Sequence, residues 1–131
     1  MAVTGVALRV LVVDDEHIVA DTLALILQRH GYNARAVYSG DDAAEMALAW
    51  PADAVVADVV MEKMDGIALA VFLAQALPSC RVLLMSGHTA TGQLIEAARK
   101  AGRDFPIIAK PFQPDRLLDF LSAEEGSPWS V

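Results

Sequence analysis

Short apolar runs alternate along this chain with longer segments in which apolar residues recur at helical spacing. The short runs are typical of strands that are buried on both faces of a parallel sheet. Val19, Leu23 and Ile26 follow the i, i+4, i+7 spacing that is typical of one buried helix face. The expected strands cover residues 10–13, 34–38, 54–57, 82–85 and 105–109. The expected helices are a first one that includes Val19 and stops at Gly31, and then 40–50, 67–77, 91–101 and 114–122.

Strict alternation of five strands with five helices predicts an α/β fold with a doubly wound, five-stranded parallel sheet. The strand order 2-1-3-4-5 of a flavodoxin-like (βα)5 fold is expected, because it places the fifth strand at an edge. Pro106 requires that edge position, since proline cannot donate a hydrogen bond to a ladder. The 131 residues suit one domain, expected over 8–122, between terminal tails at 1–7 and 123–131.

Composition narrows the classes of partner. The formal net charge of −7 argues against direct binding of nucleic acid, whose phosphates select basic surfaces. Cys80 is the only cysteine, which excludes an intrachain disulfide and is typical of a reducing compartment. The N-terminus does not resemble a signal peptide, and the longest apolar stretch, 67–77, is too short to span a membrane. A cytoplasmic protein without membrane contact is therefore expected.

Polar residues whose side chains can bind metal or take part in catalysis follow four of the expected strands. Asp14 and Asp15 follow the first strand, Asp58 the third, Ser86 the fourth and Lys110 the fifth. Because the carboxyl ends of parallel strands meet at one crevice, these side chains are expected to converge there. Each acid alone could equally be a solvated loop end or a helix cap. The complete set favours a functional site.

The charges of this set predict its chemistry. Three carboxylates and one lysine leave a net charge of −2, which a divalent cation balances, and hard oxygen ligands favour Mg²⁺. A carboxylate in such a site is a credible nucleophile toward a phosphoryl group, and Asp58, alone on the middle strand, is the best candidate. His17 and His88 could add a transition-metal site, but they lack paired ligand spacing, and this reading is disfavoured.

The segments VLVVDDE, DVVMEKMDG, LLMSG and AKPF occur in order at the four strand ends. With them, residues 8–122 resemble a response-regulator receiver domain. The resemblance implies phosphorylation at Asp58, direct binding of Mg²⁺ by Asp15, and binding by Asp14 largely through water. It also implies that Asp58 and the backbone carbonyl of Val60 are further metal ligands. The residues that would contact the phosphate and act in the switch are Ser86, Gly87 and Lys110. In this family the peptide bond from the lysine to the following proline, here Pro111, is commonly cis.

Several positions depart from the pattern of that family. Glu62-Lys63 stands where Pro-Gly is frequent, so a more mobile loop is expected after Asp58. Ile107 replaces the aromatic residue that usually swings inward on activation. Val60 and His88 occupy positions that tune how fast the phosphoryl group is lost, and the apolar Val60 suggests a longer lifetime.

The resemblance implies a signalling switch rather than an enzyme, with only self-catalysed phosphotransfer and slow autodephosphorylation. The expected donor is a histidine kinase or a histidine phosphotransfer protein. The expected recipient is a downstream protein or an output domain outside this chain, and a homodimer stays open. The alternative is a receiver-like interaction module that is not phosphorylated. An aspartate-based phosphatase is less favoured, since Val60 stands where that class needs a second acid.

Overall fold

The computed structural model of the chain describes residues 8–87, 96, 99, 105–110 and 112–122. Its five parallel strands form one sheet in the order β2-β1-β3-β4-β5, which confirms the predicted topology and the flavodoxin-like fold. The strands are β1 (Arg9–Val13), β2 (Asn33–Val37), β3 (Ala54–Asp58), β4 (Arg81–Ser86) and β5 (Ile107–Ala109).

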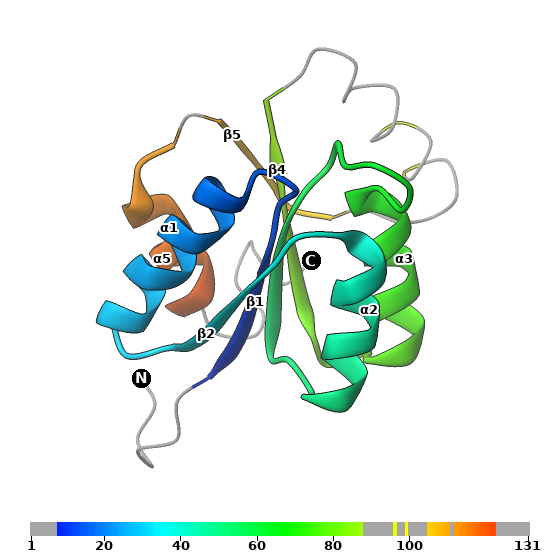
Figure 1. The fold of residues 1–131 in the computed structure, drawn as a ribbon, viewed down its shortest axis with the longest axis horizontal. Helices are drawn as coiled ribbons and strands as arrows, with labels where there is room; N and C mark the ends of the chain where they lie inside the picture. The colour runs from blue at the N-terminus through cyan, green and yellow to red at the C-terminus, as the bar shows by residue number, and fades with distance from the viewer. Residues whose placement is uncertain (1–7, 88–95, 97–98, 100–104, 111, 123–131) are drawn as a thin grey trace.

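Helices cover both faces of this sheet. They are α1 (His17–Arg29), α2 (Gly40–Ala49), α3 (Gly66–Ala76) and α5 (Pro114–Ser122). Figure 1 shows α1 and α5 together on one face and α2 and α3 together on the other. The helix expected over 91–101 lies outside the described residues, apart from Glu96 and Arg99, which are helical. No described helix is both long and apolar enough to cross a membrane.

Each strand contributes to two separate apolar cores. Val10 and Val12 of β1 pack with α1 and α5, whereas Leu11 and Val13 pack with α2 and α3. All four of these side chains are fully buried. Because successive side chains of a strand point to opposite faces, a strand between two helical layers needs apolar residues at every position. This requirement explains the unbroken apolar runs in the sequence.

The last strand is shorter than predicted. Phe105 and Pro106 precede β5 instead of belonging to it, and β5 forms the sheet edge as expected. The carbonyl oxygen of Pro106 still accepts a hydrogen bond of 3.0 Å from the Leu84 N–H. The proline thus extends the pairing with β4 through the one backbone polar group that it retains.

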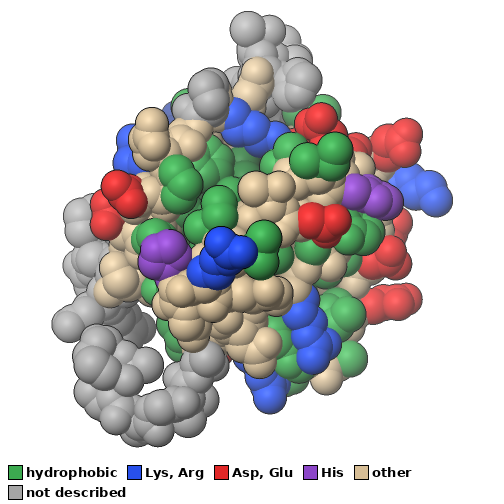
Figure 2. Space-filling view, turned by 60° about the vertical axis from the view of Figure 1, so that its left-hand side comes forward, with side chains coloured by type: hydrophobic (Ala, Val, Ile, Leu, Met, Phe, Trp, Pro, Cys, Tyr) green, Lys and Arg blue, Asp and Glu red, His purple; other side chains and the backbone are tan. Residues whose placement is uncertain are grey.

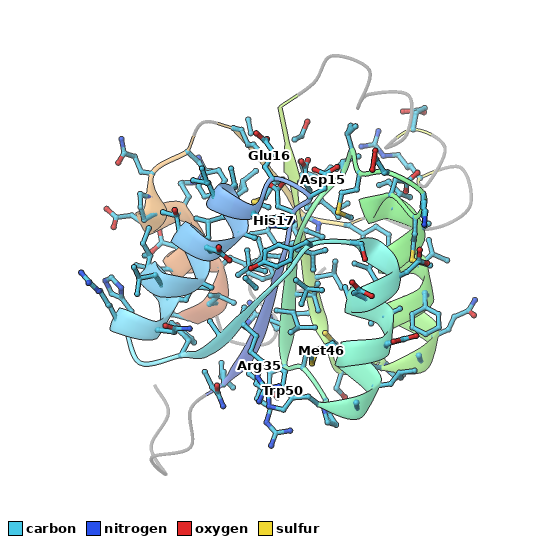
Figure 3. All side chains as sticks on the ribbon, in the orientation of Figure 1. Asp15, Glu16, His17, Arg35, Met46 and Trp50 are labelled. Carbon is cyan, nitrogen blue, oxygen red and sulfur yellow. The ribbon has the colours of Figure 1, made fainter. Side chains whose placement is uncertain are left out.

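At the other edge strand, β2, Arg35 belongs to a cluster with Arg9 of β1 and Trp50, which follows α2. The guanidinium of Arg35 lies 4.2 Å from the centre of the Trp50 ring, and that of Arg9 lies 5.4 Å from it. The Gln28 side chain of α1 donates to the carbonyl of Ala34 in β2 at 2.9 Å. Figure 3 shows Arg35 and Trp50 at the end of the sheet opposite Asp15.

The loop from β3 to α3 returns closely to the strand it leaves. The Gly66 N–H donates to the carbonyl oxygen of Val59 at 2.9 Å, and the Asp65 side chain caps α3 by accepting from the Ala68 N–H at 2.8 Å. A Cβ atom at position 66 would overlap the backbone of Asp58 and Val59. The tight return that holds the end of β3 in place therefore requires glycine.

We expect Gly66→Ala to lower the free energy of unfolding by about 1–3 kcal/mol, because the new methyl group displaces the backbone that carries Asp58. Urea denaturation followed by circular dichroism measures the change. Gly87→Ala is the matched control, since a Cβ there meets only ordinary contacts with the Lys110 side chain, the nearest at 3.4 Å. An equal loss in both variants would show that close packing at Gly66 is not the cause.

Candidate functional site

Three aspartates meet at the carboxyl ends of the neighbouring strands β1 and β3. Asp14 follows β1, Asp58 is the last residue of β3, and these strands are neighbours in the sheet. One carboxylate oxygen from each of Asp14, Asp15 and Asp58 lies within 4.8 Å of the others. Figure 3 shows Asp15 at this end of the sheet, just before the first turn of α1. The predicted convergence of the strand-end acids is therefore present.

The ammonium group of Lys110 lies between two of these acids. Its Nζ is 3.1 Å from Asp58 Oδ2 and 3.3 Å from Asp14 Oδ2. Asp14 is fully buried and Asp58 is 3% exposed, so neither carboxylate has more than slight contact with water. Buried carboxylates of this kind need a counter-charge, and Lys110 supplies one to both.

The other oxygen of each buried carboxylate accepts a hydrogen bond from a backbone N–H. Asp14 Oδ1 accepts from the Glu16 N–H at 2.9 Å, and Asp58 Oδ1 accepts from the Val60 N–H at 3.3 Å. In both cases the donor lies two residues further along the chain. Each carboxylate is thus fixed by its own following loop on one oxygen and by Lys110 on the other.

Burial and charge act in opposite directions on these groups. Burial raises the pKa of the Asp14 carboxyl above its usual value, although the Glu16 N–H and the charge of Lys110 oppose the shift. Burial would lower the pKa of Lys110, but its hydrogen bond and charge interaction with Asp58, and then those with Asp14, raise it overall. Lys110 therefore stays cationic. A further cation beside Asp14 would stabilise the charged form of this buried carboxylate.

The donor set fits a hard divalent cation. Three carboxylates against one ammonium leave a charge of −2, and the oxygens are of the type that Mg²⁺ prefers. Asp15 is the exposed member of the group, and in the described part of the chain nothing donates a hydrogen bond to its carboxylate. Asp14, Asp15 and Asp58 are therefore the residues that would hold the ion.

The other predicted site residues lie around this cluster. Ser86 ends β4, and its carbonyl oxygen accepts from the Lys110 N–H at 2.8 Å. Gly87 lies beside the aliphatic part of Lys110. Ile107 packs against the core under α2 and α3, and the side chain of Val60 is 37% exposed. His88, like Pro111, lies outside the described residues.

The loop after Asp58 contains a departure from the family pattern that has a backbone consequence. Lys63 has a φ of 60°, in the left-handed region that glycine adopts at least cost. Glycine is frequent in this family at the position that Lys63 occupies. Lys63 therefore adopts this backbone conformation at a cost in strain that glycine would not have.

Two side-chain contacts near Asp15 were not predicted. The rings of His17 and Tyr38 are stacked, with centroids 3.8 Å apart and 20° between their planes. The Tyr38 hydroxyl donates to Asp21 Oδ1 at 2.5 Å. His17 thus contacts an aromatic ring, and the group of possible metal ligands among described residues contains only the three aspartates. The expected second strand, over 34–38, includes Tyr38, whereas β2 ends at Val37 and leaves the tyrosine just after it.

A groove of about 630 Å³ opens beside the site. One wall is the start of α1, including Ile18, whose side chain is 81% exposed. The other wall contains Gly87, Lys110 and Phe112. Figure 2 brings this side of the molecule forward, and hydrophobic side chains lie open on it among charged ones.

The raised pKa of Asp14 predicts how stability depends on pH. The folded state favours the protonated carboxyl, so the stability that this group contributes is present below the usual pKa of aspartate. It is lost as the pH rises through the raised value. In metal-free buffer at pH 7, we expect Asp14→Asn to raise the free energy of unfolding by about 1 kcal/mol, because the buried charge and its repulsion from Asp58 are removed while Lys110 keeps Asp58 as its partner.

Urea denaturation at pH 7 and at pH 4 measures this difference, which should shrink at the lower pH. Added Mg²⁺ should stabilise the parent more than the variant, because the variant has lost one ligand charge. Asp119→Asn, at an exposed position of α5, controls for the change in net charge. A destabilised Asp14→Asn protein at pH 7 would contradict the expectation.

Comparison with known proteins places this geometry in a family. A family model of the response regulator receiver domain matches residues 10–122. The transcriptional regulatory protein ZraR of Salmonella typhimurium is 34% identical over 112 residues, which cover 86% of this chain and 25% of ZraR. The chemotaxis protein CheY of Thermotoga maritima is 31% identical over 115 residues, which cover 87% of this chain and 94% of CheY.

Solved structures agree with this result. A two-component transcriptional regulator AraC from Clostridium phytofermentans is 30% identical with a TM-score of 0.72, covering 88% of this chain and 89% of that one. The chain spans only 23% to 25% of several of its curated relatives. With the family model matched over nearly the whole described region, the chain belongs to the response regulator receiver domain family of two-component systems.

Proposed function

We propose that this domain is a phosphorylation-controlled switch and that Asp58 accepts the phosphoryl group. The observation that carries the proposal is the position of Lys110, whose ammonium bridges the Asp14 and Asp58 carboxylates while Asp15 stays open beside them. Such an arrangement holds one nucleophilic oxygen, neutralises charge, and leaves ligands for a cation, which together are what phosphoryl transfer requires.

The donor in this proposal is the phosphohistidine of a kinase or of a phosphotransfer protein. A carboxylate oxygen of Asp58 forms a bond to phosphorus as the phosphorus–nitrogen bond breaks. The imidazole nitrogen leaves and takes up a proton from solvent. The backbone N–H of Val60 and the Lys110 ammonium hold Asp58 in position for this attack.

Receiver domains bind Mg²⁺ at an acidic pocket, and when bound the ion supplies charge neutralisation for the transferred group. In this chain Asp14, Asp15, Asp58 and the carbonyl of Val60 are its proposed ligands. Lys110 remains cationic and would turn toward the new phosphoryl oxygens, while the Ser86 hydroxyl would donate to one of them. Gly87, adjacent to the lysine, leaves room for that movement. His88 and Ile107 are proposed to modulate the lifetime and the switch.

The proposed output is a change in the surface formed by the fourth helix, β5 and α5, of which the fourth helix lies largely outside the described residues. The signal passes to a downstream protein or to an output domain of a longer protein, and two copies pairing through this surface would be a third route. The regulators that this chain matches over a quarter of their length motivate the second route. A cytoplasmic location is part of the same proposal.

The second candidate function is an interaction module that is not phosphorylated. It is favoured by the departures at Glu62, Lys63 and Ile107, of which Lys63 has a left-handed backbone. The complete set of acids, hydroxyl and lysine at the strand ends favours the switch instead.

Intact mass after incubation with acetyl phosphate and Mg²⁺ tests the first step. We expect the parent to gain one phosphoryl group and Asp58→Asn to gain none, since its amide is a poor nucleophile. Omitting Mg²⁺ should abolish the gain in the parent, because the acidic cluster then repels the phosphodonor. A parent that gains no mass with any small phosphodonor would favour the unphosphorylated interaction module.

The groove beside Lys110 is the surface that a protein donor would cover on its way to Asp58. We expect Ile18→Asp to slow phosphotransfer from a kinase by about tenfold, because a charge replaces an apolar contact. A panel of autophosphorylated kinase domains identifies the fastest donor for the parent, and that kinase is then used on the variant.

Leu48→Asp is the matched control, because Leu48 is an exposed apolar residue, at 51%, on α2 across the sheet. Both variants should react with acetyl phosphate at the rate of the parent, since that small donor needs no docking surface. Equal kinase rates for the two variants would exclude the α1 side as the docking surface.

A further inference from the structure

Tyr38 connects the end of β2 to the first turn of α1 at two points. Its ring stacks on that of His17, the first residue of α1, and its hydroxyl donates to Asp21 at 2.5 Å. His17 and Asp21 are four residues apart and therefore share one face of the helix. The carboxylate of Asp21 raises the pKa of Tyr38 through this hydrogen bond first, so the hydroxyl keeps its proton at neutral pH.

The start of α1 has less local support than the starts of α2 and α3. The side chain of Ser39 caps α2, and that of Asp65 caps α3, each by accepting a backbone N–H. At α1 the N-cap residue is Glu16, and its side chain makes no capping hydrogen bond. The Val19 N–H still donates to the Glu16 carbonyl at 3.0 Å, but no side chain caps the turn, and an uncapped first turn opens more readily.

The residue immediately before this N-cap is Asp15, the exposed member of the acidic cluster. The backbone of Asp14 is tied to the end of β2, because its N–H donates to the carbonyl oxygen of Val37 at 3.1 Å. Val37 and Tyr38 thus hold the chain on both sides of Asp15, by a backbone bond before it and by side-chain contacts after it. Figure 3 shows Asp15, Glu16 and His17 close together near the start of α1.

We propose that Tyr38 is a positioning residue for Mg²⁺ binding, which acts by holding the first turn of α1 so that the Asp15 carboxylate faces Asp14 and Asp58. The proposal rests on the proposed function, since it concerns the cation site of the same switch. If the turn opens part of the time, the apparent affinity falls in proportion to the fraction that is closed. Tyr38 thus stabilises α1 in place of the missing cap.

The test is the dissociation constant for Mg²⁺, measured by an NMR titration of the amide resonances in the metal-free protein. Tyr38→Phe keeps the ring on His17 and removes only the hydroxyl, and we expect it to bind Mg²⁺ about three- to tenfold more weakly. Tyr32→Phe is the matched control, because it removes the only other tyrosine hydroxyl of the chain, at the far end of β2. That control should bind Mg²⁺ as the parent does.

A double-mutant cycle separates positioning from charge. Asp21→Ala removes the acceptor of the Tyr38 hydroxyl and also one negative charge near the site. In the Asp21→Ala background, Tyr38→Phe should have no further effect on Mg²⁺ affinity if the hydroxyl acts through Asp21. The thermal midpoints of the metal-free variants show whether a general loss of stability accompanies the change.

The outcomes are distinct. The proposal is supported if Tyr38→Phe weakens Mg²⁺ binding in the parent background but has no effect in the Asp21→Ala background. Binding equal to that of the parent, or a Tyr38→Phe effect that persists without Asp21, overturns it. If the parent itself binds no Mg²⁺, the proposed function fails as well, whereas a parent that binds and is phosphorylated while Tyr38→Phe matches it refutes only the role of Tyr38.

Discussion

The ion pairs of Lys110 with two buried aspartates are the interaction on which this end of the molecule depends. Asp14 and Asp58 stand on neighbouring strands, where two carboxylates without a cation would repel each other in a poorly solvated site. Lys110 follows β5, so its side chain must cross the end of β4 to reach them. Ser86 and Gly87, at the end of β4, are small enough to let it pass. The strand order thus brings one ammonium group within reach of two acids on neighbouring strands.

The fold could be predicted from sequence because a parallel sheet covered on both faces imposes an unusually clear pattern. Four consecutive apolar side chains in β1 (10–13) and in β3 (54–57) exclude a solvated face, and the regular alternation of such runs with helical segments leaves little choice of topology. The limits of elements were harder to predict. The helix expected to open at His17 does begin there, whereas β2, expected over 34–38, spans Asn33–Val37 and leaves Tyr38 outside the strand. Pro106 was expected within the fifth strand but precedes β5, and it pairs with β4 only through its carbonyl oxygen.

The site divides in the same way. The convergence of Asp14, Asp58 and Lys110 follows from their positions at strand ends, which any parallel sheet brings together. The sharing of Lys110 between two carboxylates depends on side-chain reach and burial, which sequence spacing does not contain. The contact of Tyr38 with Asp21 depends on how α1 lies against β2, and the groove beside Ile18 depends on two elements nearly a hundred residues apart in sequence. Such features arise from packing between elements and are visible only in three dimensions.

The cluster at the outer edge of β2 has a consequence for the behaviour of the protein at high concentration. An edge strand offers unpaired backbone groups on which a strand of another molecule can add, and repeated addition leads to aggregates. Here Gln28 occupies the carbonyl of Ala34, and Arg35, held over Trp50, places a positive charge along the same edge. A second copy approaching in register would bring a like charge against it. The domain thereby limits self-association at the β2 edge, whereas the acidic cluster lies at the other end of the strands, away from this protected edge.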